Sequence, residues 1–537
     1  MQNYANTLCI NCWQVKRYID LYSVTSAFGF PDEDLQLVSE LYTKAQESWS
    51  SSIITANTFN NDASSNVLPI LRNQINVYSH FLEKVAELAR SKWTEFDLTF
   101  MGIGLGVLFI SLFLHIVAIM KVHRLFKSPC SHINNSWTLS RVLIPLLLVG
   151  IRANSFLSNS YILEEGKVAN FFLATTAIIS TQNAIIKGKI AVEEISFLML
   201  NIVLRYSFEP ILSKQNNLIN NDIDPSILAV IAYEAFPIIS MLLLAYLFYK
   251  RAYSLPSCET PTTFMFGALL SYLLLALHWV SESRVIEVPS LVQYIGKTIA
   301  PRTIYSIGFV LVLFAFVQAF LSSRSTFNDR RILAAFLAMM CAWSPTIIML
   351  LGRQGPMVAF ISLFGVWCII RLQNLEQNYV DVVYGRSVMD LTSITQWNLL
   401  AVSLFFYSGH WCMFDGLRYG AAFIGFDNFN FLRQGALLAL DTFGISHILP
   451  IFGLPILFFY EYSGEKQASS SLFGSLTQAF LIYGFETAAT TTFALVSVAI
   501  HRRHLMVWGL FAPKFVFDAV GLILTDFFIF LASLYYF

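Results

Sequence analysis

Long apolar runs follow one another from residue 98 to the end of the printed sequence. A bilayer core needs about 20 helical residues, so each run predicts a membrane-spanning helix, and they make about 12 to 14 spans in all. No alternating pattern typical of a transmembrane β-barrel appears. We therefore predict an all-α fold, a polytopic transmembrane helical bundle over residues 98–537. The predicted spans are 98–120, 138–158, 168–186, 194–213, 226–249, 262–280, 302–321, 332–351, 356–371, 396–413, 431–460, 472–500 and 505–536. The run at 431–460 contains Pro450 and Pro455, so two short helices are the alternative there.

Residues 1–97 have a different pattern, polar overall with apolar positions at helical spacing. The apolar positions recur between Trp13 and Tyr22 and again between Leu37 and Tyr42. A turn with Pro31 separates these two stretches, residues 50–66 are predicted to be a loop, and a helix is predicted from Leu68 to Leu88. We expect a short helical hairpin beside the membrane, followed by the membrane domain 98–537.

Composition supports a membrane protein and excludes some partners. The chain is 56% hydrophobic and 13% charged, whereas soluble domains carry about 25% charged residues. Its net charge is zero, so a nucleic-acid partner has no electrostatic support. The seven cysteines show one C-x-x-C pair, Cys9 and Cys12, with no second pair or histidine tract to complete a metal site.

The basic residues predict an orientation. Lysines and arginines are more frequent after the odd-numbered spans, beginning with Lys121, Arg124 and Lys127, so those ends are predicted to be cytosolic. Residues 1–97 are then lumenal, although no signal sequence precedes them here. The simplest explanation is that the chain is the C-terminal part of a longer protein. The sequon at Asn134 falls in a predicted cytosolic loop, so no glycan is expected there.

A polar island interrupts the apolar runs at residues 408–430, which read SGHWCMFDGLRYGAAFIGFDNFN. Its four glycines argue against a continuous helix. Non-helical backbone at membrane depth is tolerated inside protein or along a wet cavity, so the island is a candidate site for a lipid headgroup. An interfacial loop with an aromatic belt, or a zinc site from His410 and Cys412, are the alternatives. The candidate substrate-binding residues here are His410, Asp415, Arg418 and Asp427.

A second candidate is Arg353, in the stretch LLGRQGP between two spans. A cation at this depth is a functional candidate by default, and its alternative is a short turn with a snorkelling arginine. We predict that Arg353 lines one lumenal-side cavity with the residues of the island.

Several other charges fall within apolar runs. Arg205 and Glu209 are four residues apart and can pair on one helix face. Glu234, Glu486 and Asp526 are isolated acids, for which pairing with neighbours is favoured over proton transport. The sequence has no Walker loop, dinucleotide fingerprint, G-x-S-x-G or H-E-x-x-H motif, so no catalytic or metal-binding residue is predicted.

Four stretches resemble the GPI ethanolamine phosphate transferases: NCWQVKRYIDLYS at 11–23, LLGRQGP, the island extended to Gly435, and RRHLMVWGLFAPKFVFDAVG at 502–521. The last is most similar to the third-mannose (PIG-O) type, and the island resembles its plant members. The resemblance implies transfer of phosphoethanolamine from phosphatidylethanolamine to a mannose of the GPI precursor, in the endoplasmic reticulum membrane. It also implies a small stabilising membrane subunit of the PIG-F type.

The chain departs from this family in one respect. The resemblance implies a lumenal phosphatase-like catalytic domain that binds a divalent metal, which is expected to be zinc. This domain is absent from the printed sequence. The chain is expected to need no cofactor of its own, to bind lipid substrate, and to be inactive by itself. Two alternatives are a lipid or solute transporter (flippase), which predicts an inverted repeat with two broken helices, and a membrane-bound acyltransferase that uses His410.

Overall fold

The structure, a computed structural model, describes most of the chain. It covers residues 2–25, 30–58, 64–93, 97–126, 135–186, 192–216, 227–253, 262–283, 288–321, 329–384, 391–459, 469–502, 504 and 506–537. The chain divides into two compact units, Met1–Met101 and Gly102–Phe537. Each unit is helical, and no strand occurs in the described ranges.

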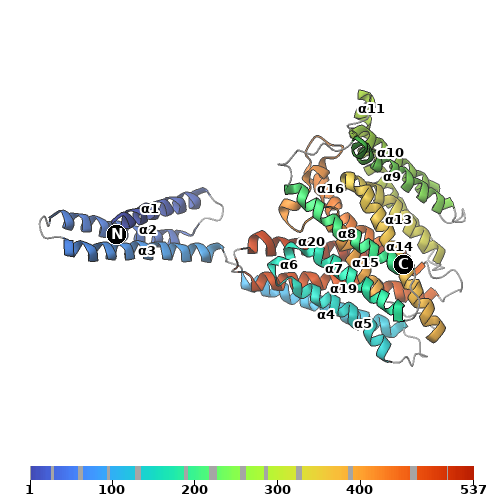
Figure 1. The fold of residues 1–537 in the computed structure, drawn as a ribbon, viewed down its shortest axis with the longest axis horizontal. Helices are drawn as coiled ribbons and strands as arrows, with labels where there is room; N and C mark the ends of the chain where they lie inside the picture. The colour runs from blue at the N-terminus through green and yellow to red at the C-terminus, as the bar shows by residue number, and fades with distance from the viewer. Residues whose placement is uncertain are drawn as a thin grey trace. The chain divides into compact units, whose positions relative to one another are not determined.

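The first unit contains three helices, α1 (Gln2–Thr25), α2 (Asp32–Thr58) and α3 (Ser64–Trp93), which lie side by side (Figure 1). Three consecutive acids open α2, where they favour the positive end of the helix dipole. The loop expected at 50–66 is wrong at both ends, because α2 continues to Thr58 and α3 begins at Ser64. Serine, threonine and asparagine cost only a few tenths of a kcal/mol each in a helix, so a helix that is well started and packed extends through them.

The C-x-x-C pair belongs to the packing of this unit. Cys12 is fully buried and its Sγ contacts the backbone oxygen of Tyr78 at 3.6 Å, while the Tyr78 hydroxyl donates to Cys9 Sγ at 3.3 Å. Burial, with a smaller contribution from Cys9, raises the pKa of Cys12 to about 12. Cys12 is therefore a protonated core residue at neutral pH.

The second unit is a helical bundle, so the all-α polytopic class is confirmed. Each predicted span overlaps a helix, but the helix of the span predicted at 396–413 ends at Tyr407, and the span predicted at 431–460 is divided among several elements. Its long helices are α4 (Leu98–Phe126), α5 (Asn135–Ser155), α7 (Glu165–Ile186), α8 (Val192–Asn216), α9 (Ile227–Tyr253), α10 (Thr262–Glu282), α12 (Ala300–Leu321), α13 (Asp329–Leu350), α14 (Gly355–Tyr384), α15 (Leu391–Tyr407), α16 (Phe431–Phe443), α19 (Ser469–Ile500) and α20 (Ala512–Tyr536). Short helices are α6 (Asn159–Leu163), α11 (Ser290–Tyr294), α17 (Leu449–Gly453) and α18 (Ile456–Phe459).

Eight helices in the described ranges are long and apolar enough to cross a membrane by length and composition. This is fewer than the number of apolar runs. Helices α7 and α8 open with acidic residues and include polar ones such as Asn170 and Asn201, which are buried against each other, Asn170 donating to the backbone oxygen of Asn201 at 3.4 Å. Helices with lower hydropathy are thus held through their neighbours as well as through lipid.

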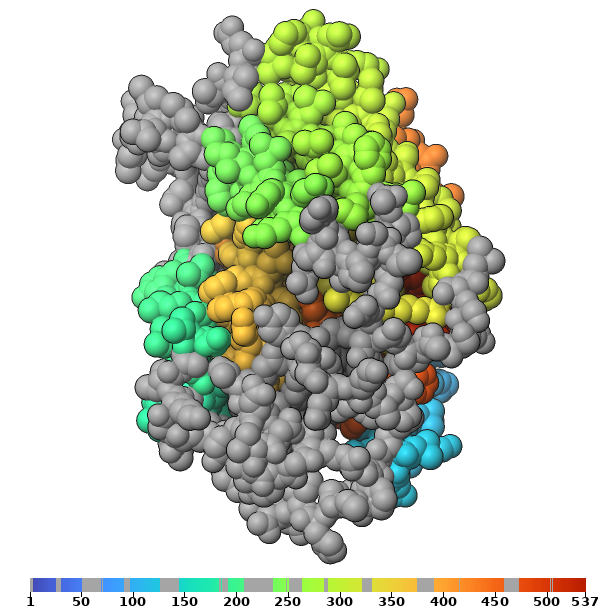
Figure 2. Space-filling model, turned by 90° about the vertical axis from the view of Figure 1, so that its right-hand side faces the viewer, coloured from blue at the N-terminus to red at the C-terminus, as the bar shows by residue number. Residues whose placement is uncertain are grey.

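Helix α15 is the most enclosed element, with nearly all side chains from Ser393 to Tyr407 buried. It contacts α5, α7, α8, α14 and α19. On the face shown in Figure 2, the green to yellow-green residues of the α9–α12 region gather at the top. The run at 431–460 is broken, as its two prolines predict: π-helical Gly444–Ile448 follows α16, and α17 and α18 are short.

Candidate functional site

The polar island at 408–430 leaves the end of α15 and returns to the start of α16 without a continuous helix, as its glycines predict. Its helical structure is limited to two short 3-10 turns, Phe414–Gly416 and Tyr419–Phe423. Gly409 and Gly425 adopt φ of 83° and 81°, a left-handed conformation that is unfavourable for residues with a Cβ. The island is therefore a folded loop with fixed bends.

The second bend docks on the beginning of α12. A Cβ at Gly425 would lie 2.8 Å from Cβ of Pro301, so only glycine fits this contact. Arg302 Nε donates to the backbone oxygen of Gly425 at 2.7 Å, and the Tyr305 hydroxyl donates to that of Ile424 at 3.3 Å. Helix α12 thus fixes the position of the island.

Arg418 is anchored by a buried acid and by backbone oxygens. Its Nε donates to Asp441 Oδ2 at 3.1 Å, and its Nη2 contacts Oδ1 of the same residue. Nη1 and Nη2 also reach the backbone oxygens of Leu351 and Leu350, at 3.1 Å and 3.3 Å. The Asp441 side chain is fully buried, whereas that of Arg418 is 27% exposed. The pair therefore fixes the guanidinium, while part of the Arg418 side chain stays accessible.

His410 lies on the other side of the same carboxylate. Its Nε2 is 3.2 Å from Asp441 Oδ2, its Nδ1 is 2.8 Å from the Ser408 hydroxyl, and its ring stacks on Phe405. Both ring nitrogens have partners, and the side chain is 1% exposed. His410 and Cys412 turn to different partners, because the Cys412 sulfur lies near Lys514. This arrangement does not favour a zinc site from these two residues.

Arg353 sits in the 3-10 turn Gly352–Gln354, directly after the two backbone oxygens that hold Arg418. Its Nη2 donates to the backbone oxygen of Glu282 at 3.0 Å. Arg353 is two residues after Leu351, and consecutive Cα atoms are about 3.8 Å apart. Because Arg418 contacts Leu351, the turn and the island meet at one rim of the bundle.

Two predicted residues of the island remain, Asp415 and Asp427. Asp427 is exposed, and the side chain of Asp415 lies outside the described residues. The structure thus joins His410 and Arg418 through Asp441, and it places Arg418 against the backbone oxygens that directly precede the Arg353 turn. Ligand binding by these residues stays a prediction.

Asp441 was missed by sequence reasoning. It lies within the apolar stretch FLRQGALLALDTF of α16, and an acid within an apolar run was the signal that could have found it. Asp415 is the acid nearer to Arg418 in sequence, whereas the pairing of Arg418 with Asp441, across most of the island, depends on tertiary structure.

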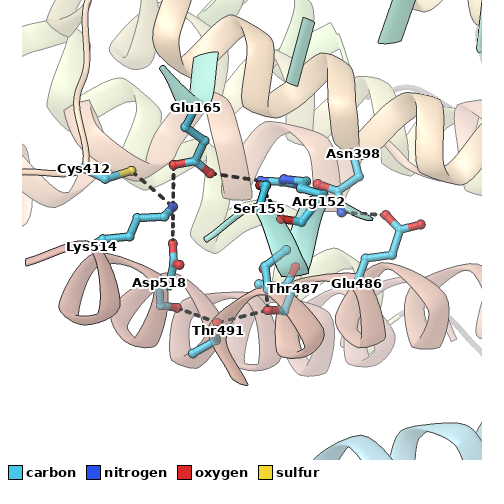
Figure 3. Close-up of polar contacts among 11 residues, drawn as sticks. Arg152, Ser155, Glu165, Asn398, Cys412, Glu486, Thr487, Thr491, Lys514 and Asp518 are labelled. Atoms are coloured by element: carbon cyan, nitrogen blue, oxygen red, sulfur yellow. Dashed lines mark hydrogen bonds and ion pairs between the residues drawn. The ribbon is translucent and has the colours of Figure 1, made fainter. Parts of the chain in front are cut away.

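A second group of charges lies deeper, and we call Arg152, Glu165, Lys514 and Asp518 the buried ion cluster. Figure 3 shows Lys514 directed toward both carboxylates, with Nζ 2.7 Å from Glu165 and 2.8 Å from Asp518. Arg152 Nη2 is 3.4 Å from Glu165. The side chains of Lys514 and Glu165 are 5% and 4% exposed. These residues come from α5, α7 and α20, so the cluster joins three helices.

The cluster balances two cations against two carboxylates. Buried charges are tolerated when they are paired, because an unpaired ion loses its hydration without compensation. Lys514 Nζ also lies 3.6 Å from Cys412 Sγ, which connects the cluster to the polar island. Lys514 and Asp518 fall in the RRHLMVWGLFAPKFVFDAVG stretch that carried the family resemblance. Their spacing of four residues was a local signal for an ion pair, but the partners on α5 and α7 were not predictable from spacing.

Glu486 on α19 is buried and paired with neighbouring side chains, as predicted for the acids within apolar runs. Thr395 Oγ1 and Asn398 Nδ2 each donate to its carboxylate at 2.6 Å. Of the other isolated charges, Arg205 is exposed, and the side chains of Glu209 and Glu234 lie outside the described residues. Across the described part of the chain, no group of three or more His, Cys, Asp or Glu residues could hold a metal ion.

The fold and these clusters define a class: an all-α polytopic helical bundle with apolar helices of spanning length and ions paired in its interior. The chain is similar to a set of curated proteins that are all named GPI ethanolamine phosphate transferase 3. The family resemblance seen in the sequence is therefore confirmed.

The similarity is distant and partial. The mouse catalytic subunit is 27% identical over 218 residues, which cover 33% of this chain and 20% of that protein. The human catalytic subunit is 26% identical with the same coverage, and the Schizosaccharomyces pombe protein is 24% identical over 40% of this chain and 22% of its own length. The chain thus matches only about a fifth of the length of these relatives. No protein-family model and no solved structure matches.

Proposed function

We propose that this chain is the membrane domain of a GPI ethanolamine phosphate transferase that acts in GPI-anchor biosynthesis. The observation that carries the proposal is that the curated relatives share this one name across mammals and fungi. The reaction would transfer phosphoethanolamine from phosphatidylethanolamine to a mannose of the GPI precursor, in the endoplasmic reticulum membrane. A small membrane subunit of the PIG-F type would stabilise the domain.

In this proposal the membrane domain binds lipid, and the bond-making chemistry belongs to a catalytic domain. Both lipid substrates have acyl chains that lie in the bilayer and phosphate groups at the membrane surface. The rim formed by the island and the Arg353 turn offers the Arg418 side chain, which is held by Asp441 and is 27% exposed. Four of its five N–H groups donate to Asp441, Leu350 and Leu351, so one N–H of Nη1 would be left to donate to a phosphate oxygen. The rim residues would orient a headgroup toward the catalytic domain.

A chimeric protein tests this proposal. In cells that lack their own GPI ethanolamine phosphate transferase 3, the membrane part of the mouse protein would be replaced by residues 98–537. We expect the chimera to restore GPI-anchored proteins at the cell surface, whereas the chain expressed by itself should transfer no phosphoethanolamine. Transfer by the purified chain would refute the division of roles, and a chimera that is made at normal level but restores nothing would refute the membrane-domain assignment.

The variant Arg418→Ala in the same chimera tests the role of the rim. If Arg418 serves a headgroup, transfer per molecule of folded chimera falls, in addition to any loss of protein level that the unpaired Asp441 causes. If the contact with Asp441 is purely structural, the protein level or stability falls and the remaining protein is fully active. The variant Lys297→Gln, a rim cation whose Nζ lies 3.8 Å from Glu282, is the matched control for charge.

A lipid or solute transporter is the second candidate, and the buried ion cluster favours it, because paired ions inside a bundle are found along transport paths. A transporter would move a labelled lipid or solute in proteoliposomes that contain the chain without any catalytic domain. The chimera restores GPI-anchored proteins only if the first candidate is right.

A further inference from the structure

Two arginines stack on one aromatic ring at the edge of the island. The guanidinium carbon of Arg302 lies 5.0 Å from the ring centroid of Phe426, and that of Arg433 lies 3.9 Å from it. The ring of Tyr305 stacks on Phe426 with an interplanar angle of 10°. We call Arg302, Phe426 and Arg433 the arginine stack.

Backbone oxygens, not carboxylates, hold this arrangement. Arg302 Nε donates to the oxygen of Gly425 at 2.7 Å, and Arg433 Nη2 donates to the oxygen of Asn428. Within the described ranges no carboxylate forms an ion pair with either guanidinium, although Asp427 follows Phe426 directly and is exposed. Two fixed positive charges therefore share one ring without a neutralising partner there, which leaves a local attraction for an anion.

The surroundings of the stack indicate which anion. Three large apolar side chains beside it are among the most exposed in the molecule, Phe429 at 71%, Phe431 at 78% and Leu432 at 80%. Phe431 and Leu432 open the apolar helix stretch Phe431–Gly453, which is long enough to span a membrane. Arg433 is at the start of this stretch, where an arginine lies at the depth of the lipid phosphates, and Arg302 shares the Phe426 ring with it, while the apolar side chains face acyl chains.

We propose that the arginine stack binds the phosphate group of a phospholipid from the surrounding bilayer. The guanidinium groups of Arg302 and Arg433 donate to the phosphate oxygens, Phe426 and Tyr305 keep both groups in place, and Phe429 to Leu432 pack against the acyl chains. This site is separate from the Arg418–Asp441 pair. It depends on the bundle lying in a bilayer and not on the transfer reaction, so it stands or falls independently of the proposed function.

The test uses the purified, delipidated chain in detergent and three probes. These are dioleoylphosphatidylcholine, dioleoylglycerol with the same acyl chains but no phosphate, and inorganic phosphate. Native mass spectrometry and thermal stabilisation measure binding. We expect binding of the phospholipid only, and an affinity that is weaker by about tenfold or more in the double variant Arg302→Gln/Arg433→Gln, because charge-assisted hydrogen bonds are lost.

Three further variants make the result specific. Phe426→Leu keeps both charges and removes the ring, so it should weaken binding less than the double variant does. Arg302 is on the exposed side of the stack. The single variant Arg302→Gln should therefore weaken binding, and it tests the site even if the double variant does not fold. Lys297→Gln, a rim cation paired with Glu282, should have no effect. Unchanged binding in Arg302→Gln and the double variant, an equal loss in Lys297→Gln, or equal binding of dioleoylglycerol or free phosphate would overturn the proposal.

Discussion

At the residue scale, the main finding is that the ions inside the bundle are paired across elements. Lys514 contacts Glu165 and Asp518, and Arg418 contacts Asp441, while each of these acids is largely or fully buried. Removing one partner leaves the other as an uncompensated charge, which is far costlier than losing a surface ion pair. The stability of the bundle therefore depends on a few charged residues as well as on its apolar core.

The variant Lys514→Met tests this dependence. It leaves two buried carboxylates with Arg152 as their cation, so we expect the free energy of unfolding to fall by about 3 to 5 kcal/mol. Titration of the purified protein with a denaturing detergent measures the change. Lys167→Met, which removes a pair with Glu164 at partly exposed side chains, is the control and should cost about 1 kcal/mol or less.

A compensated variant separates charge from packing. Adding Asp518→Leu to Lys514→Met leaves the Arg152–Glu165 pair neutral by itself, so part of the lost stability should return. A double variant as unstable as the sum of its parts, or a Lys514→Met protein as stable as the Lys167→Met control, would contradict the importance of charge pairing here.

At the element scale, the island owes its position to bends that only glycine allows. Gly425 combines a left-handed φ with close contact to Pro301 at the start of α12. This bend also presents Phe426 to Tyr305 and to the two arginines of the stack. A single backbone position thus links the island to α12.

We therefore expect Gly425→Ala to lower the free energy of unfolding by about 1 to 3 kcal/mol through backbone strain and the clash with Pro301. Gly420→Ala is the matched control, because a Cβ there meets no atom within 4 Å and the backbone does not need glycine. Thermal unfolding of both purified variants measures the difference. Equal melting temperatures for the two variants would show that the bend does not position the island.

The elements were predictable from the sequence, but their partners were not. Apolar runs of spanning length located the helices of the second unit, and Pro450 and Pro455 predicted the interruption after α16. The loop expected at 50–66 failed because polar residues with mild helix propensity were taken as a break. The contacts of Asp441 with Arg418 and of Glu165 with Lys514 join residues far apart in sequence, and helical spacing detects only neighbours three or four positions apart.

At the scale of the whole molecule, the chain consists of a three-helix unit and a polytopic bundle. Its orientation in the membrane rests on the distribution of lysine and arginine. In a second chimera that carries residues 1–537 after the catalytic domain of the mouse protein, a glycosylation sequon introduced near Ser64 should be modified and one near Ser128 should not, as a glycosidase-sensitive shift on a gel would show. Modification near Ser128 with none near Ser64 would invert the predicted topology.

The buried ion cluster also bears on how the protein is made. Arg152 and Glu165 enter the membrane with α5 and α7, whereas Lys514 and Asp518 arrive with α20, after most of the chain has been synthesised. During that interval the Glu165 carboxylate has only the more distant Arg152 to offset it. A chain that stops before Lys514 would therefore keep this ion pair without its second cation, and we expect α5 and α7 to pack less stably in it than in the finished protein.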